Sequence, residues 1–161
     1  MLALSIDYRW LVFIHIVGVL GFVMFHGVSV VVALRLRKER DRARIAELMQ
    51  FSGSSIAGMY VSLLILLVGG VWAGFRLDWW RYAWIWVALG VLVFMIAEMS
   101  AVARPYYQRV KEAVEVRPSG VPRRSDEELE QMLGSALPLI NAAAGFAALL
   151  FIAWLMVYKP W

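Results

Sequence analysis

The sequence contains no cysteine, only two histidines, and long stretches without a charged side chain. The lack of cysteine excludes disulfides, thiolate metal sites, thiol catalysis and c-type haem attachment. With 62% hydrophobic and 17% charged residues, the chain of 161 residues is too apolar for an ordinary soluble domain. The chain also lacks a Ser-His-Asp set, a glycine-rich phosphate loop and an HExxH motif, so hydrolytic chemistry has no support. Whether the protein is an enzyme stays open at this point.

Four apolar runs have the length of membrane spans, and they cover residues 10–34, 54–75, 83–103 and 136–158. A helix needs about 20 apolar residues to cross a hydrocarbon core of about 30 Å. The first run is too long for the apolar core of a cleaved signal peptide, and a basic block follows it. We therefore predict an all-α protein, a single transmembrane four-helix bundle over residues 1–161.

The distribution of basic residues predicts how this bundle is oriented. Of the 16 Lys and Arg residues, 12 lie in segments 35–53 and 104–135, between spans one and two and between spans three and four. The positive-inside rule places these segments in the cytoplasm and both termini outside. We expect a multi-pass protein of the bacterial inner (plasma) membrane, with the lipid bilayer as its first partner. The net charge is +4, and the basic residues lie beside the spans, where they set the orientation of the protein and attract anionic lipid. No nucleic-acid partner is therefore expected.

The two basic segments predict local structure outside the membrane. Residues 35–50 are expected to extend the first helix into the cytoplasm, and residues 51–54 to form a break before the second span. The long cytoplasmic loop, 104–135, is expected to hold a short surface helix over 105–115 and a turn at 117–122. Ser125 and Glu128 match a capping box that starts the next helix, which Pro138 is expected to kink.

Small residues on two spans predict close helix packing. Ser55, Ser62, Gly69 and Ala73 form one stripe on the second span, and the fourth span contains Ala142–Gly145. Small side chains let helix backbones approach closely, which drives association where no hydrophobic effect is available. The favoured interpretation is packing within one four-helix bundle, and a homodimer face is the alternative.

Both histidines lie on the first span and are the first candidate site. His15 and His26 are separated by about 20° around the helix and by about 16 Å along it, so they share a face but cannot bind one iron. Imidazole is the commonest haem-iron and copper ligand. We therefore predict a haem b-binding or metal-binding protein that uses His15 and His26, with haem b or copper as the cofactor.

A second candidate site is a polar cluster within the membrane. His26 lies at the same depth as Glu98, Asn141, Tyr60 and Ser62, in the cytoplasmic third of the bilayer. A charged side chain facing lipid costs about 2.5 kcal/mol or more, so Glu98 is expected to face the bundle interior, with His26 as its natural partner. The alternative function is a proton-coupled transporter or channel component using His26, Glu98 and Asn141. A third alternative is a non-catalytic scaffold subunit of a larger membrane complex.

Several short motifs of the sequence also resemble those of a known family. They are Phe-Ile-His-Ile-x-Gly at Phe13–Gly18, the basic loop, the Gly-rich second span, Arg104-Pro105 after the third span, and the ending Met156-Val-Tyr-Lys-Pro160. This pattern resembles an uncharacterised bacterial family of four-helix integral membrane proteins, a domain-of-unknown-function family. It is similar at a distance to CopD-type copper-resistance domains and to HemJ-type membrane protoporphyrinogen oxidases. The HemJ likeness implies haem b on His15, and the CopD likeness implies copper at His15 or His26.

Overall fold

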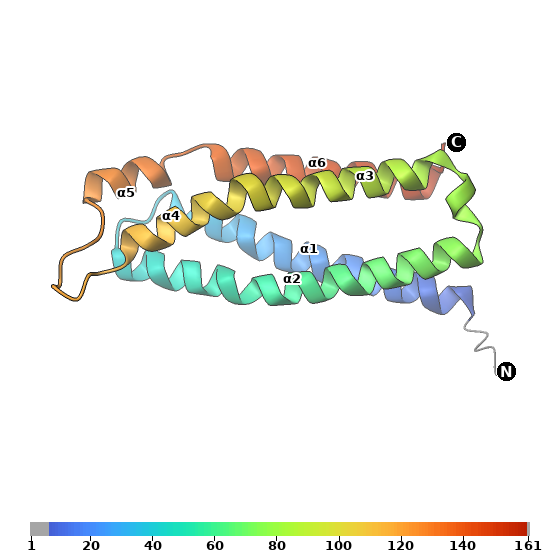
Figure 1. Cartoon of the computed structure of the whole chain (residues 1–161), viewed down its shortest axis with the longest axis horizontal. Coiled ribbons are helices and arrows are strands. Elements are labelled where there is room, and N and C mark those ends of the chain that lie inside the picture. Colours follow the sequence, from blue (N-terminus) through green and yellow to red (C-terminus); the bar gives the residue numbers. More distant parts are fainter. Residues whose placement is uncertain (1–6, 161) are drawn as a thin grey trace.

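Four long helical segments run back and forth along one axis (Figure 1), as the four apolar runs predict. The computed structural model describes residues 7–160. The segments are α1 (Tyr8–Leu36); α2 (Arg42–Arg76); α3 (Ala83–Glu98) with the π-helical turn η2 (Met99–Ala103) and α4 (Arg104–Val114); and α5 (Asp126–Leu133) with α6 (Leu137–Tyr158). Each segment is long and apolar enough to cross a membrane. The predicted all-α bundle with four spans is confirmed.

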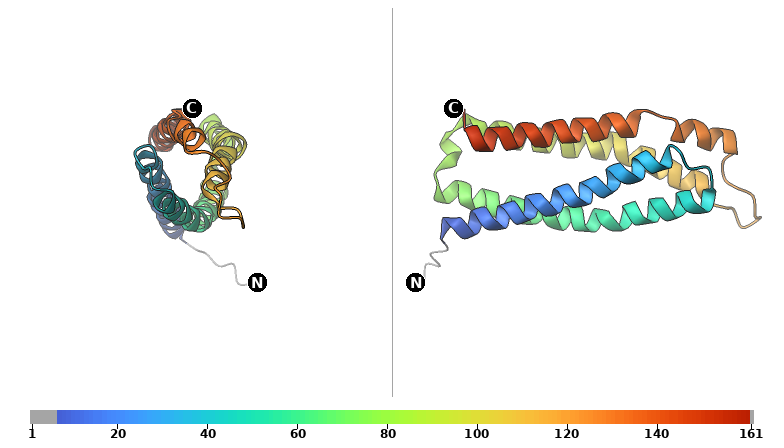
Figure 2. Two further views of the ribbon diagram at one scale, coloured as in Figure 1. Left: turned by 90° about the vertical axis from the view of Figure 1, so that its left-hand side faces the viewer. Right: turned by 180° about the vertical axis from the view of Figure 1, so that it is seen from behind.

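The bundle is built from two helix pairs. Along most of its length α1 packs against α2, while α3 runs antiparallel to α6 and contacts it. The end-on view shows the helices in the cyclic order α1, α2, α3, α6 (Figure 2). Helix α2 contacts the short 3-10 helix η1 (Trp79–Arg81) at one end of the third segment and α4 at the other. Contacts between α1 and α6 close the ring.

The α1–α2 pair is held by small residues. Ser55, Ser62, Gly69 and Ala73 are all buried, which confirms the predicted packing stripe. A Cβ atom at Gly18 would lie only 2.7 Å from the Cα atom of Leu66, so the two helix backbones are in direct contact there. Such close approach maximises van der Waals contact, the main source of helix association in lipid. On the outside of the spans many large apolar side chains are exposed, as expected for a surface that faces lipid.

A packed core lies at the end of the bundle that carries segments 35–53 and 104–135, here termed the basic end. It joins residues of α1, α2, α4 and α5: Val32, Leu36, Ile45, Val110, Ala113, Val114, Leu129 and Leu133. Arg42 fastens this core, because its guanidinium donates hydrogen bonds to the Asp126 carboxylate and to the carbonyls of Ala113 and Arg124. The basic end therefore has a packed core built on helices that continue into the spans.

The structure corrects two expectations about the first basic segment. Helix α1 ends at Leu36, and the predicted extension of the first helix is instead the beginning of α2, capped by the Asp41 carboxylate that accepts from the Ala43 N–H. The predicted break at 51–54 is absent, because α2 is continuous. The Ser54 and Ser55 hydroxyls donate to carbonyls one turn back within the helix and so need no loop.

The second basic segment follows its prediction more closely. The short helix at 105–115 exists as α4, but it continues the third span through η2 and is not a separate surface helix. The turn at 117–122 is present, with Gly120 at a positive φ of 80° and a bridge between Val116 and Pro122.

The last helix begins as its cap predicts, but it is interrupted before the membrane span. The capping box of Ser125 and Glu128 is confirmed at the start of α5. The helix is then interrupted at residues 134–136, and Pro138 lies in the first turn of α6. Proline is tolerated there because its missing N–H would have no helical partner, so the expected kink is wrong and a helix start takes its place.

Candidate functional site

His26 is the most deeply buried polar side chain in the membrane-spanning part of α1, with only 4% of its surface exposed. Its ring stacks on Phe22, with centroids 6.1 Å apart, and meets the ring edge of Phe146 at 5.9 Å. A Cβ atom at Gly145 would lie 3.0 Å from Nε2, so the missing side chain at Gly145 gives the imidazole its room. Among the described residues, neither ring nitrogen has a hydrogen-bond partner.

Glu98 lies at the same depth as His26, on the other helix pair. Leu155 of α6 and Ala88 of α3 belong to one buried cluster, and the two helices are antiparallel. Glu98 is ten residues beyond Ala88, and Gly145 is ten residues before Leu155. Because both helices rise by about 1.5 Å per residue, Glu98 is level with Gly145, against which His26 packs.

Asn141 completes a group of three unpartnered polar side chains from three helices. It lies one turn before Gly145 on α6, and its Nδ2 atom is buried without a hydrogen-bond partner, as is Oε2 of Glu98. His26, Glu98 and Asn141 are termed the polar layer below. In the described part of the chain no hydrogen bond joins them, so the expected direct pair of His26 and Glu98 is not formed. Each unpartnered buried polar group lowers the stability of the fold by about 1–3 kcal/mol. Native structures contain few such groups, so three at one level are unusual.

A change of helix type accompanies the polar layer. The π-helical turn η2 begins at Met99, directly after Glu98, and ends at Ala103. A π turn inserts an extra residue per turn, and such turns occur frequently at functional sites. The hydroxyl of Ser100 donates to the Ile96 carbonyl beside the turn. Sequence reasoning missed this feature, and no residue pattern in the third span announces it.

His15 lies in a different environment, against α2. Its Nδ1–H donates to the Leu66 carbonyl at 2.6 Å, and the ring is only half-buried. A Cβ atom at Gly70 would lie 2.8 Å from Nδ1, so glycine is needed for this contact. The hydrogen bond fixes the tautomer in which Nε2 keeps its lone pair, as in histidines that bind metal ions.

The two histidines do not form one site. His15 faces α2 and His26 faces α6, because α1 leans away from α2 toward α6 as it approaches the basic end (Figure 2). Over residues 7–160 there is no group of three or more His, Cys, Asp or Glu side chains that could hold a metal ion.

Tyr60 and Ser62, the two α2 residues of the predicted polar cluster, lie apart from the polar layer. Ser62 is buried in the α1–α2 contact, where a Cβ atom at Gly21 would lie 2.6 Å from its hydroxyl oxygen. Tyr60 is 57% exposed on the outer surface of α2. Residues that are two positions apart in a helix point in directions about 200° apart, so the side chains of Tyr60 and Ser62 could not both face the interior.

Comparison with known protein families identifies the family of this chain. Residues 9–160 match the model of the family DUF2269, described as a predicted integral membrane protein. The chain belongs to this family. The expected resemblance to an uncharacterised membrane-protein family is thereby confirmed, and this DUF2269 protein is an integral, multi-pass protein of the lipid bilayer. Comparison with curated proteins and with solved structures found no match.

Proposed function

We propose that this DUF2269 protein is the proton-conducting component of a membrane transporter or channel, with the polar layer as the place where the proton binds. The observation that carries the proposal is the imidazole of His26, which is buried with both nitrogens unpartnered at the depth of Glu98. Ionisable residues inside membrane segments are costly, and those that are retained mark ion and proton pathways.

The three side chains have complementary chemistry for this role. A neutral imidazole accepts a proton, a protonated carboxyl group donates one, and the Asn141 amide offers both a donor and an acceptor. Because the three groups come from α1, α3 and α6, a small shift between the two helix pairs would make or break their contacts. Protonation of His26 adds a positive charge and a second N–H donor, and both favour contacts with Glu98 and Asn141.

The test is proton uptake by vesicles that contain the purified protein and a trapped pH-sensitive dye, driven by a potassium diffusion potential. Wild type is expected to acidify the vesicles faster than protein-free controls. Glu98→Gln and His26→Leu are expected to return uptake to the protein-free rate, whereas Tyr60→Phe, on the outer surface of α2, keeps it. Equal uptake with wild type and with Glu98→Gln would overturn the proposal.

A specific observation favours a second function, in which His15 binds haem b or copper. The Leu66 carbonyl orients its ring and leaves Nε2 as the ligand atom. His26 suits this role less, because Nε2 packs against Gly145. A bound haem iron or copper ion would supply redox chemistry, and this chain would contribute one oriented imidazole. The resemblance of the sequence to HemJ-type proteins implies the same residue, and its resemblance to CopD-type proteins implies His15 or His26.

Absorbance spectra and metal analysis of protein expressed with haem and copper supply test this second function. A Soret band or bound copper is expected in wild type and in His26→Ala, and its loss is expected in His15→Ala. Wild-type protein without haem and copper, or an unchanged signal in His15→Ala, would contradict it.

A further inference from the structure

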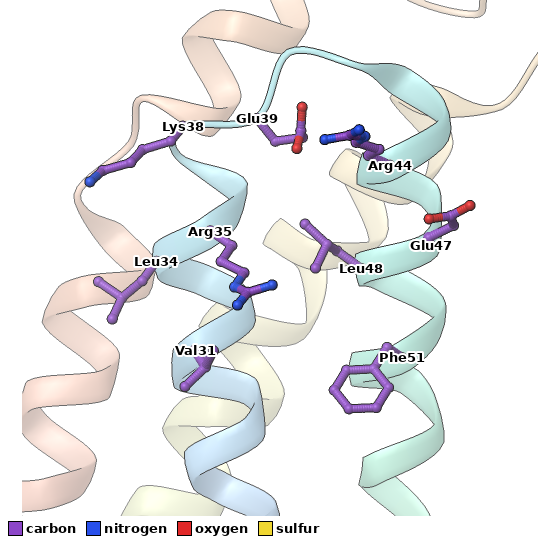
Figure 3. A pocket seen from close by; sticks show the side chains of 9 residues that line it. All are labelled: Val31, Leu34, Arg35, Lys38, Glu39, Arg44, Glu47, Leu48 and Phe51. Carbon is purple, nitrogen blue, oxygen red and sulfur yellow. The ribbon is translucent and has the colours of Figure 1, made fainter.

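The outer face of the basic end has a groove between the end of α1 and the beginning of α2 (Figure 3). Its volume is about 760 Å³ and it is open to the surroundings. The groove belongs neither to the polar layer nor to the His15 contact. We propose that it binds the head group and upper acyl chains of an anionic phospholipid.

The walls of the groove have the polarity profile of a phospholipid. Val31 on α1 and Phe51 on α2 lie at its lower end, Leu48 on α2 lies higher, near the level of Arg35, and Leu34 points away from α2 (Figure 3). Val31 lies within the apolar stretch that ends at Leu34, and Phe51 lies just before the second span, so this end of the groove lies at the depth of acyl chains. Phe51 and Leu34 are exposed, which leaves an apolar surface available to a chain lying alongside.

Basic residues form the upper part of the groove. Arg35 follows directly after the apolar stretch, and its guanidinium lies between the two helices, while Arg44 extends from α2 above it (Figure 3). Lys38 lies at the edge, with its ammonium directed away from Arg44. Guanidinium groups bind phosphate oxygens in paired hydrogen bonds. Basic pockets at the cytoplasmic side of transmembrane helices bind anionic head groups in the same way.

These cations are available for a ligand. Arg40, Arg42 and Arg124 at the same end form ion pairs with carboxylates. No ion pair in residues 7–160 engages Arg35, Lys38 or Arg44. The unpaired positive charge therefore lies where lipid phosphates lie.

Two acidic residues also line the groove and limit its charge. Backbone N–H groups of Asp41 and Arg40 donate to the Glu39 carboxylate, and these bonds, with the nearby Arg44, hold the pKa of Glu39 below its usual range. Glu39 thus stays ionised and competes with phosphate for Arg44, while Glu47 is exposed on α2. Removing these negative charges should strengthen binding of an anionic lipid, which makes the site testable in both directions.

Native mass spectrometry of the full chain in detergent tests the site with three probes: phosphatidylglycerol, phosphatidylcholine and glycerol 3-phosphate. Wild type is expected to retain phosphatidylglycerol in preference to the other two. The double variant Arg35→Gln/Arg44→Gln is expected to bind it about thirty-fold more weakly. Glu39→Gln is expected to bind it more tightly than wild type.

The matched control is Arg104→Gln/Arg109→Gln, which removes the same charge from exposed positions of α4 at the same end. It is expected to bind phosphatidylglycerol as wild type does. Equal retention of phosphatidylcholine by wild type would overturn the proposal, and so would equal weakening in the control pair. Binding of glycerol 3-phosphate as strong as that of the lipid would make the site one for free phosphate and also overturn it. Glu39→Gln keeps the test decisive if the arginine pair disturbs folding.

Discussion

At the scale of single residues, the environments of the two histidines separate their roles. His15 donates to a carbonyl of α2 and keeps one nitrogen as a potential ligand, whereas His26 is enclosed by aromatic rings and a glycine and has no hydrogen-bond partner within residues 7–160. Their equal helical phase made them look like one site in the sequence. Helix α1 is tilted, so that it contacts α2 near His15 and approaches α6 near His26. The position of a residue on a single helix does not reveal this tilt.

Glycine at position 18 is expected to be essential for the α1–α2 contact. Gly18→Ala would place a methyl group against the Leu66 backbone, which cannot move aside as a side chain can, so we expect a loss of about 1–3 kcal/mol in unfolding free energy. Gly27→Ala is the matched control, because nothing lies within 4 Å of a Cβ atom there. Better helix propensity should leave it neutral or more stable by up to about 1 kcal/mol. Thermal unfolding in detergent measures both, and equal stability of the two variants would contradict this packing.

At the scale of elements, the four spans were predictable from the length of the apolar runs alone, because bilayer thickness fixes helix length. The capping box at Ser125 was equally predictable, since its hydrogen bonds join residues three apart. The ends of the elements were less predictable. Helix α2 passes through Ser52–Ser55 because serine hydroxyls can bond back within a helix, and the sequence does not reveal which choice tertiary packing favours.

The sequence predicted the depth of the polar layer but not which residues belong to it. The helical rise placed His26, Glu98 and Asn141 at one level, and in the structure His26 packs against Gly145, one turn after Asn141. The same counting included Tyr60, which faces outward, and overlooked the π turn after Glu98. Depth follows from one helix at a time, whereas facing depends on how helices pack against one another.

The docking of α5 is expected to depend on Arg42 much more than on its neighbour Arg40. Arg42 is mostly buried and bonds to Asp126 and to two backbone carbonyls, so Arg42→Ala should cost about 2 kcal/mol or more. Arg40 pairs with Glu130 at the surface, so Arg40→Ala should cost less than about 1 kcal/mol. Hydrogen exchange of the 126–133 amides measures the difference. Equal exchange in both variants would show that Arg42 does not hold α5 in place.

At the scale of the whole molecule, the basic end is a folded cap on one end of a membrane bundle, and its orientation is open to direct measurement. Because the chain has no cysteine, single cysteines can be introduced without a background signal. We expect Ser119→Cys, in the turn of the basic end, to be protected from an impermeant thiol reagent in intact bacterial cells. Arg81→Cys, at the opposite end, should be labelled. The reverse pattern would invert the proposed orientation.

The proposed function depends on proton binding at the polar layer. The most direct measurement is the infrared carbonyl band of protonated Glu98 in membranes, followed as a function of pH and identified by its loss in Glu98→Gln. If His26 and Glu98 act together, we expect His26→Gln to shift the pH midpoint of this band and Tyr60→Phe to leave it unchanged. A Glu98 band that titrates identically with and without His26 would contradict it.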